Sequence, residues 1–272
     1  MENLENTSVN NIAETETPIQ ENLTVHESSL VRAMMEVGMF YGLNRSKTNP
    51  KNRPSIAFTK SGVEIIDVVK AIRALDEAAQ EIKNEIISGG SIILVGSTPA
   101  VKSAVKGMGV KLGLPYVTER WLGGTLTNFK TISDRLQYFK KLKSDKASGG
   151  FAKYTKKEII SLDRELEKLD RFFSGIETME KLPGLIVIFN LKNHEIAARE
   201  ARKINIKSIG FLNTNADPDL VDYPIIVNDK NTKSVEFIVS YLENIIEEAK
   251  KIKETAAIAS DSLPLPNIGD NG

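Results

Sequence analysis

Two short, uninterrupted apolar runs restrict the architecture of this chain more than any other feature. They lie at residues 91–96 (Ser-Ile-Ile-Leu-Val-Gly) and 185–190 (Leu-Ile-Val-Ile-Phe-Asn). Runs of this length without polar alternation are typical of parallel strands that are covered on both faces. Further strands are expected over 206–212 and 225–227, so the sequence predicts an α/β domain built on a parallel sheet.

Apolar residues at helical spacing lie between these strands. Asp67 in front and Gly89-Gly90 behind delimit one helix, and Ser97-Thr98-Pro99 begins another with a cap and a first-turn proline. A hairpin is expected where residues 55–58 and 63–66 flank a glycine turn. The other predicted helices are Ser29–Val37, Glu195–Ile204 and Thr232–Ile252.

The segment from Pro115 to Ile132 connects a strand to a helix through a bend. It contains the only tryptophan, Trp121, beside Arg120, then Gly123-Gly124, which permit positive φ and close backbone approach. Thr127 or Asn128 is in position to cap the following helix. Two interpretations stay open, a hinge in the α/β domain and a docking corner for phosphates and bases.

Residues 129–175 interrupt the α/β alternation with two helical seams. The first seam is Phe129, Ile132, Leu136 and Phe139, and the second is Ile159, Leu162, Leu166, Leu169 and Phe173. A glycine loop between them predicts an inserted antiparallel coiled-coil hairpin. Residues 120–175 carry thirteen basic and seven acidic side chains. Because the lysines gather toward the loop, polyanion contact is favoured over a merely solvated face.

Charge is distributed unevenly along a chain whose formal net charge is zero. Residues 1–27 hold six glutamates and no basic residue, and residues 254–272 hold three acidic residues and no basic one. Both tails are predicted to be disordered. Residues 28–253 therefore carry all thirty-six basic and twenty-seven acidic side chains, a net charge of +9. Within them, residues 28–128 and 176–253 form the predicted α/β domain, and the basic excess indicates a nucleic-acid partner.

Residues 38–54 read as a loop because of their Gly, Asn and Pro content. Arg45, Lys47, Lys51 and Arg53 alternate there with small polar residues, and no acidic residue intervenes. An extended backbone would spread these cations along a phosphate track beside Phe40 and Tyr41.

Little in the sequence indicates catalysis. The chain has no cysteine, metal-ligand cluster, nucleophile elbow or phosphate loop. His194 near Asp217 is an imaginable acid/base pair, but Asp217-Pro218-Asp219 is typical of a turn. No signal peptide or membrane-spanning run is present, so we expect a cytoplasmic protein without metal or cofactor. The alternatives are a small-molecule-binding domain or enzyme using strand ends near Ser97 and Asn213, and a protein-only scaffold using the hairpin seam.

Two motifs resemble those of the bacterial ribosomal protein S2 family. Residues 120–129 (RWLGGTLTNF) resemble its signature, and Asn213-Thr214-Asn215 with Asp217-Pro218-Asp219 and Asp222-Tyr223-Pro224 resemble a second motif. The resemblance covers about residues 30–250. It implies a flavodoxin-like or Rossmann-like three-layer fold, no catalysis, and binding to small-subunit (16S) rRNA and neighbouring ribosomal proteins, including the large mRNA-binding one. DNA and membranes are not expected partners.

The chain departs from the family pattern at three places. Gly38–Leu43 lacks two histidines that the family usually has, Thr98-Pro99 stand where lysines are usual, and Ile226-Val227 replace Pro-Gly. These differences suggest altered rRNA contacts with the same function. The residues expected to contact rRNA are Arg45, Lys47, Lys51, Arg53, Arg120, Trp121, Asn128, Lys130, Lys140, Lys141, Lys143, Lys156 and Lys157.

Overall fold

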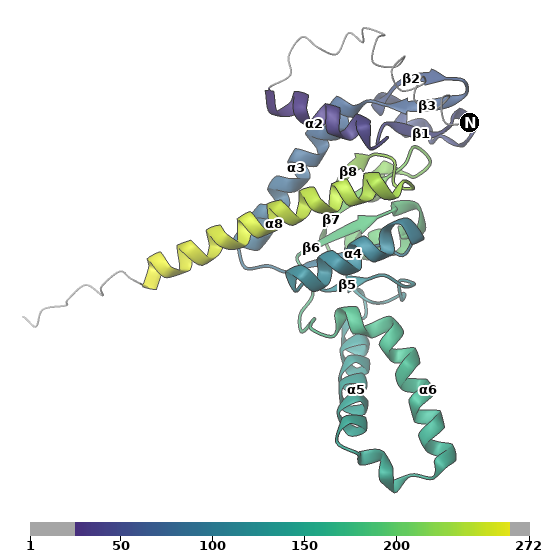
Figure 1. The fold of residues 1–272 in the computed structure, drawn as a ribbon, viewed down its shortest axis with the longest axis vertical. Helices are drawn as coiled ribbons and strands as arrows, with labels where there is room; N and C mark the ends of the chain where they lie inside the picture. The colour runs from purple at the N-terminus through teal and green to yellow at the C-terminus, as the bar shows by residue number, and fades with distance from the viewer. Residues whose placement is uncertain (1–24, 262–272) are drawn as a thin grey trace, which may run out of the picture.

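A five-stranded parallel sheet forms the centre of the molecule, whose computed structural model describes residues 25–261. All four neighbouring pairs are parallel. The strands lie side by side in the order β5 (Tyr116–Val117), β4 (Ile92–Val95), β6 (Leu185–Phe189), β7 (Lys207–Leu212) and β8 (Tyr223–Ile226) (Figure 1). The predicted α/β class and the parallel sheet are confirmed, and the arrangement fits a Rossmann-like fold.

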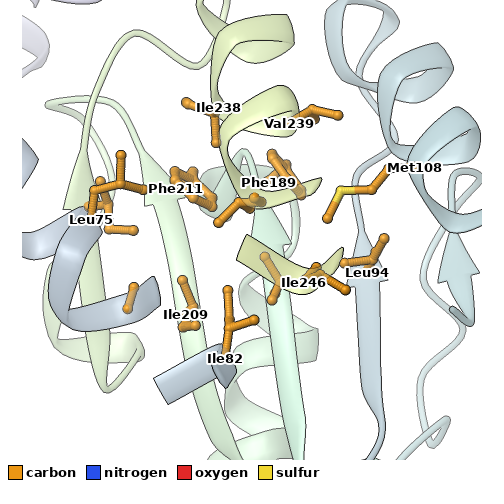
Figure 2. Packing of buried hydrophobic residues seen from close by; sticks show 14 of the residues in the cluster. Leu75, Ile82, Leu94, Met108, Phe189, Ile209, Phe211, Ile238, Val239 and Ile246 are labelled. Carbon is orange, nitrogen blue, oxygen red and sulfur yellow. The ribbon is translucent and has the colours of Figure 1, made fainter. Parts of the chain in front are cut away.

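Helices cover both faces of this sheet. Ile92 and Leu94 enter the hydrophobic cluster beneath α3 (Val68–Ile87), α4 (Pro99–Leu112) and α8 (Thr232–Asp261), which Figure 2 shows around Phe189 and Phe211. Ile93 and Val95 enter the opposite cluster with α7 (Glu195–Lys203). Because successive strand residues project to opposite faces, burial on both sides explains the lack of polar alternation in the sequence.

A second, three-stranded antiparallel sheet follows helix α2 (Val25–Glu36). Its order is β1 (Tyr41–Asn44), β3 (Val63–Ile66) and β2 (Ile56–Lys60), and β2 and β3 form the predicted hairpin. The prediction that residues 38–54 form a loop was wrong in part. They contain β1 and two 3-10 helices, η1 (Arg45–Lys47) and η2 (Pro50–Ser55). Strand β1 pairs with the later strand β3, a pairing that the local Gly and Asn content conceals.

Helices α5 (Phe129–Ala147) and α6 (Lys156–Phe173) project together from the body (Figure 1). We call residues 129–173 the arm; its connection contains η3 (Gly150–Lys153). Helix α5 buries Ile132, Leu136, Phe139 and Leu142, whereas α6 buries only Phe173 among its residues. The predicted α6 seam residues Ile159, Leu162, Leu166 and Leu169 are half-buried. The remaining 3-10 helices are η4 (Ser174–Ile176), η5 (Leu191–Asn193) and η6 (Pro218–Leu220).

Several predicted boundaries and caps need correction. Helix α2 begins at Val25, before the predicted Ser29, and α8 continues to Asp261, beyond the predicted Ile252. The rest of the two predicted disordered tails, residues 1–24 and 262–272, lies outside the described residues. Asp67 caps α3 through its side chain as predicted, but Thr98 and Asn128 occupy cap positions without a side-chain cap hydrogen bond.

Candidate nucleic-acid interface

The bend before α5 is organised around a side chain that the sequence did not single out, Glu200 of α7. Its Oε1 accepts from the Trp121 indole N–H at 3.3 Å and the Gly124 amide at 2.7 Å. Its Oε2 accepts from the Leu126 amide at 3.0 Å and from the amide and hydroxyl of Thr127, both at 3.3 Å. We call residues 121–127 with Glu200 the corner. Five donors converge there on one carboxylate that is only 8% exposed.

The corner therefore resembles an anion-binding site whose anion is supplied by the chain itself. Its backbone amides are directed at Glu200, so the interpretation of a docking corner for phosphates was wrong for these donors. Gly124 has φ 90°, which suits glycine, whereas Gly123 has a negative φ and open space around it. Glu200 was missed because it belongs to another helix; the available signal was a glutamate between the inward-facing Ala197 and Ala201.

The corner residues predicted to contact RNA separate into two groups. Trp121 is 5% exposed and its indole N–H is already bonded, so it packs at the corner and offers no face for base stacking. Arg120, Asn128 and Lys130 are exposed. Asn128 accepts a hydrogen bond from the Thr131 hydroxyl at 2.9 Å in place of the expected cap bond.

The second motif holds the basic segment 45–53 against the strand ends. The Asn52 amide group donates to the carbonyls of Thr214 and Ala216, both at 2.9 Å, and Asn52 is fully buried. The Thr214 carbonyl also accepts from the Asn49 backbone amide at 2.8 Å. The Thr214 hydroxyl accepts from the Leu43 backbone amide at 3.1 Å. At Gly42 a Cβ would come within 2.8 Å of Thr214 Cγ2. This close approach requires glycine, and we call the contact between residues 42–53 and 213–219 the clamp.

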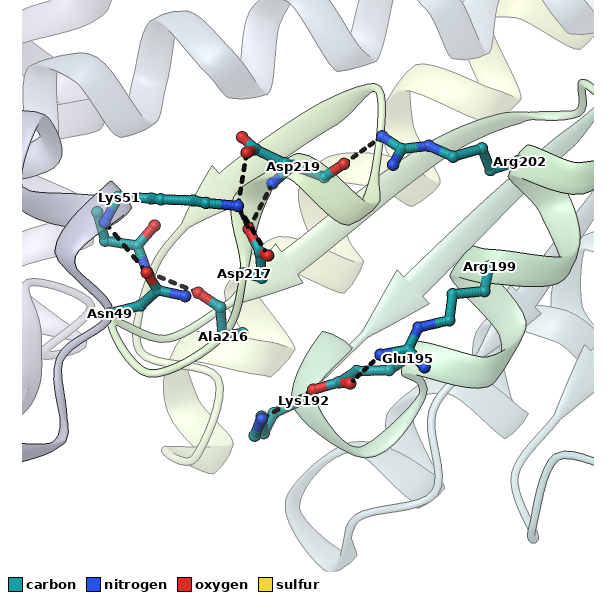
Figure 3. A network of polar contacts seen from close by, with 10 residues as sticks. Asn49, Lys51, Lys192, Glu195, Arg199, Arg202, Ala216, Asp217 and Asp219 are labelled. Atoms are coloured by element: carbon teal, nitrogen blue, oxygen red, sulfur yellow. Dashed lines mark hydrogen bonds and ion pairs between the residues drawn. The ribbon is translucent and has the colours of Figure 1, made fainter.

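Four predicted phosphate-binding cations lie on the clamp, and one of them is already neutralised. The Lys51 ammonium is 2.7 Å from Asp219 and 2.9 Å from Asp217 (Figure 3). Its hydrogen bonds to Asp219 and Asp217 raise its pKa, and the same contact lowers the pKa of Asp217. Arg45, Lys47 and Arg53 are exposed and make no ion pair within residues 25–261. The structure brings these three together on one segment with their charges available.

The predicted RNA-binding lysines of the arm include one in an ion pair and four that are not, within the described residues. Lys143 pairs with Glu177 at 2.9 Å, lies 5.5 Å above the Phe139 ring, and has its pKa raised by the Glu177 hydrogen bond. The other predicted arm lysines are exposed and have no ion pair in the part of the chain that the structure describes. These are Lys140, Lys141, Lys156 and Lys157.

The two side chains that come closest to a catalytic pair are Ser97 and His194, which lie at the strand ends beside the corner. A cleft of about 300 Å³ includes Ser97, Arg120 and His194. His194 Nε2 accepts the Ser97 amide at 3.2 Å and lies 3.1 Å from the Ser97 hydroxyl. A neutral ring thus carries its proton on Nδ1, which has no hydrogen-bond partner among residues 25–261, and burial lowers the pKa of His194 to about 4. Without an orienting carboxylate, this histidine is a poor general base; Asp217, its imagined partner, binds Lys51 instead.

A second cleft, of about 430 Å³, opens between the ends of β4 and β6, where the strand order reverses. Thr98, Asn190 and Asp229 contribute to its lining. Burial raises the pKa of Asp229 to about 6, and Asn213 donates to it at 3.4 Å. Such switch points are the usual ligand crevices of α/β sheets. The lining residues do not form a phosphate loop, because Pro99 supplies no amide at the helix start.

Within residues 25–261, no group of three His, Asp or Glu side chains is placed to hold a metal ion. None of the described helices combines the length and apolarity that crossing a bilayer requires.

The parallel sheet and the exposed cations on the clamp and the arm define an α/β protein whose residues 28–253 carry a net positive charge. The sequence model of the family Ribosomal protein S2 matches residues 34–249. Small ribosomal subunit protein uS2 of Nocardia farcinica is 36% identical over 241 residues, covering 88% of this chain and 84% of that protein. The uS2 protein of a Roseiflexus species is 38% identical over 225 residues, covering 83% and 86%. The corresponding protein of Corynebacterium diphtheriae is 36% identical over 231 residues, covering 85% and 87%.

This chain belongs to the ribosomal protein S2 family. The resemblance seen in the two sequence motifs is confirmed. The family consists of structural, non-enzymatic proteins, which agrees with the expectation that the chain is not an enzyme.

Proposed function

We propose that this protein is a structural constituent of the small ribosomal subunit in the cytoplasm, where it binds 16S rRNA and neighbouring ribosomal proteins during translation. The observation that carries the proposal is family membership over most of the chain. The relatives are named for the small ribosomal subunit, and the match to this chain covers 84%, 87% and 86% of their lengths. The large mRNA-binding ribosomal protein is one proposed neighbour.

The clamp segment is the first proposed rRNA contact. Arg45, Lys47 and Arg53 are exposed on a segment whose backbone is fixed by Asn49 and Asn52, so their side chains are presented from a rigid base. Exposed cations on a fixed backbone attract phosphate at little ordering cost. Lys51 is a weaker candidate, because phosphate must compete with two carboxylates.

The arm is the second proposed contact, acting as an inserted antiparallel coiled-coil hairpin. Lys156 and Lys157 occupy the first turn of α6, where the positive end of the helix dipole disfavours cations. Glu158, in a capping box with Thr155, offsets this only in part. Lysines at such a position contribute little to folding, which supports a role for them and for Lys140 and Lys141 in binding phosphate. Arg120, Asn128 and Lys130 extend the contact toward the body.

Sedimentation of cell extract through sucrose at increasing KCl tests this proposal. We expect the protein to migrate with small subunits at low salt and to dissociate as salt rises. If about six phosphates are neutralised, the logarithm of its affinity for structured rRNA falls by roughly 4 to 5 per tenfold increase in salt. Migration away from the subunits at low salt, or binding that ignores salt, contradicts the proposal.

A triple variant identifies the clamp contribution. Replacing Arg45, Lys47 and Arg53 by glutamine reduces the salt slope by about 2 to 3. The matched control replaces three cations that already pair with glutamates, Lys83, Lys111 and Lys207. It removes the same formal charge and leaves the slope within about one unit of the parent value.

A further inference from the structure

We propose that the three-stranded sheet β1-β3-β2 carries a stacking platform for single-stranded RNA, formed by Tyr41 and Phe58. The inference rests on the proposed function in that RNA is the partner. It goes further by assigning unpaired bases, and not only phosphates, to a defined surface.

Two exposed aromatic rings lie in one row of this sheet. Tyr41 of β1 and Phe58 of β2 are both paired with Ile65 of β3. Directly opposite residues of antiparallel strands project to the same face, so the rings flank Ile65 on one side of the sheet. Tyr41 is 40% exposed and Phe58 is 42% exposed, whereas Ile65 between them is 8% exposed. The row thus combines a buried centre with two accessible rings.

The Tyr41 ring is held in place before any ligand arrives. Its centroid is 4.2 Å from that of Phe40, which is 7% exposed. The neighbouring Gly42 lies close to Thr214 and Glu64, which packs β1 against these two residues. A ring that is ordered by packing and still accessible loses little conformational entropy when a base stacks on it.

The charge around the rings suits a polyanion. Residues 37–63 contain Arg45, Lys47, Lys51, Arg53 and Lys60 and no acidic residue. Lys60 is paired with Val63 two rows along, on the same face of the sheet as Phe58, and is exposed. The nearby Glu64 is 5% exposed and accepts the Thr59 hydroxyl at 2.7 Å. Aromatic rings bordered by cations are the usual elements of single-strand binding surfaces.

The spacing of the rings favours a single strand over a duplex. Tyr41 and Phe58 are separated by two strand spacings, roughly 10 Å. Stacked bases of a helix are only about 3.4 Å apart, so both rings are occupied together only when the bases are splayed. A protein strand added to the free edge of β2 is the competing occupant, but the absence of acidic residues from 37–63 favours RNA.

Fluorescence anisotropy with the full-length protein tests the platform. The probes are a labelled ten-nucleotide single-stranded RNA and the same RNA annealed to its complement. We expect tighter binding of the single strand, and a loss of about fivefold or more for Tyr41→Leu and for Phe58→Leu. Tyr41→Phe keeps the ring and the affinity. The matched control is Val110→Ala, which trims a 66% exposed apolar side chain on α4, outside the platform and both proposed rRNA contacts, and leaves the affinity unchanged.

A fluorescence signature separates stacking from charge attraction. In Phe58→Trp, the new indole is exposed while the native Trp121 is buried. Single-stranded RNA is expected to quench the added emission, and the parent protein, measured in parallel, changes little. Thermal unfolding of each variant confirms that it is folded, and Phe58, being exposed, is the safer site for this comparison.

Equal affinity of the parent, Tyr41→Leu and Phe58→Leu for single strands, or no quenching in Phe58→Trp, overturns the platform. Loss of a ribosomal-protein contact on the subunit with unchanged RNA binding also overturns it and assigns the face to a protein. The ribosomal role is judged separately by sedimentation, because that role survives if the parent still migrates with small subunits.

Discussion

The corner and the clamp are both built from sequence motifs, but they use their polar groups in opposite ways. At the corner, five donors are directed inward at the Glu200 carboxylate. At the clamp, Asn52 and Thr214 bind the backbone, and Arg45, Lys47 and Arg53 remain directed at solvent. The difference shows that a motif rich in potential phosphate ligands is a binding site only where its donors are not already satisfied within the chain.

The most disruptive test of this comparison is Glu200→Ala. It leaves four N–H donors and one hydroxyl of the corner without their shared acceptor, and the donors of Trp121 and Leu126 are buried. We expect a loss of about 4 kcal/mol in the free energy of unfolding, measured by urea denaturation. Glu200→Gln keeps one acceptor and should lose less, about 2 kcal/mol. A stable Glu200→Ala variant would show that the carboxylate does not organise the corner.

A second test compares one titrating group beside each region. His194, near the corner, has a folded pKa of about 4, below its usual 6.5, so its stabilisation is present above pH 6.5 and is lost as pH falls toward 4. Asp229, beside the clamp, has a folded pKa of about 6, above its usual 3.8. Its stabilisation is present below pH 3.8 and is lost as pH rises toward 6. Each effect amounts to about 3 kcal/mol.

The two effects oppose each other between pH 4 and 6, so variants separate them. Asp229→Asn should lose stability more steeply than the parent as pH falls through this window, and should be more stable at pH 7. His194→Gln should instead gain stability relative to the parent on acidification. Urea midpoints measured from pH 4 to 7 provide the comparison. Superimposable pH profiles for the parent and Asp229→Asn would contradict the assignment.

A third test weakens the clamp without touching its cations. Asn52→Ala removes the amide that donates to the Thr214 and Ala216 carbonyls and opens a small cavity. We expect a loss of about 2 kcal/mol. Subunit affinity should also fall, since Arg45, Lys47 and Arg53 are then presented from a looser segment. Affinity equal to that of the parent, measured where the variant is fully folded, would mean that the rigidity of the clamp is irrelevant to binding.

Local patterns predicted most of the fold. The apolar runs at β4 and β6 and the Asp67 cap of α3 depend on neighbours in sequence, and each was placed correctly. Strand β1 was missed because its partner β3 lies beyond a loop rich in Asn and Pro. The end of α8 was placed too early because residues 251–256 are exposed and bury no apolar side chain that would mark the helix as continuing.

The sites were less predictable, because their partners are far apart in sequence. Trp121 and Glu200 are 79 positions apart, and Asn52 and Thr214 are 162 apart. A single sequence shows which side chains can donate or accept, but it does not show which of them the fold satisfies internally. Hence Trp121 was expected to meet RNA and is buried, and Lys51 was counted as a free cation and is paired.

Lys51→Gln gives the smallest expected effect and bears most directly on the difference between the two regions. Its ion pairs with Asp217 and Asp219 are exposed, and exposed pairs contribute little, so the free energy of unfolding should stay close to that of the parent. If Lys51 is committed to these carboxylates, the salt slope of subunit binding should also stay within about half a unit of the parent value, whereas Arg53→Gln should lower it by about one. Equal decreases for the two variants would show that phosphate displaces Asp217 and Asp219 from Lys51. RNA binding would then free Lys51 from its two carboxylates at the clamp. At the corner, by contrast, five donors are bonded to Glu200 within the chain and do not exchange this partner for phosphate.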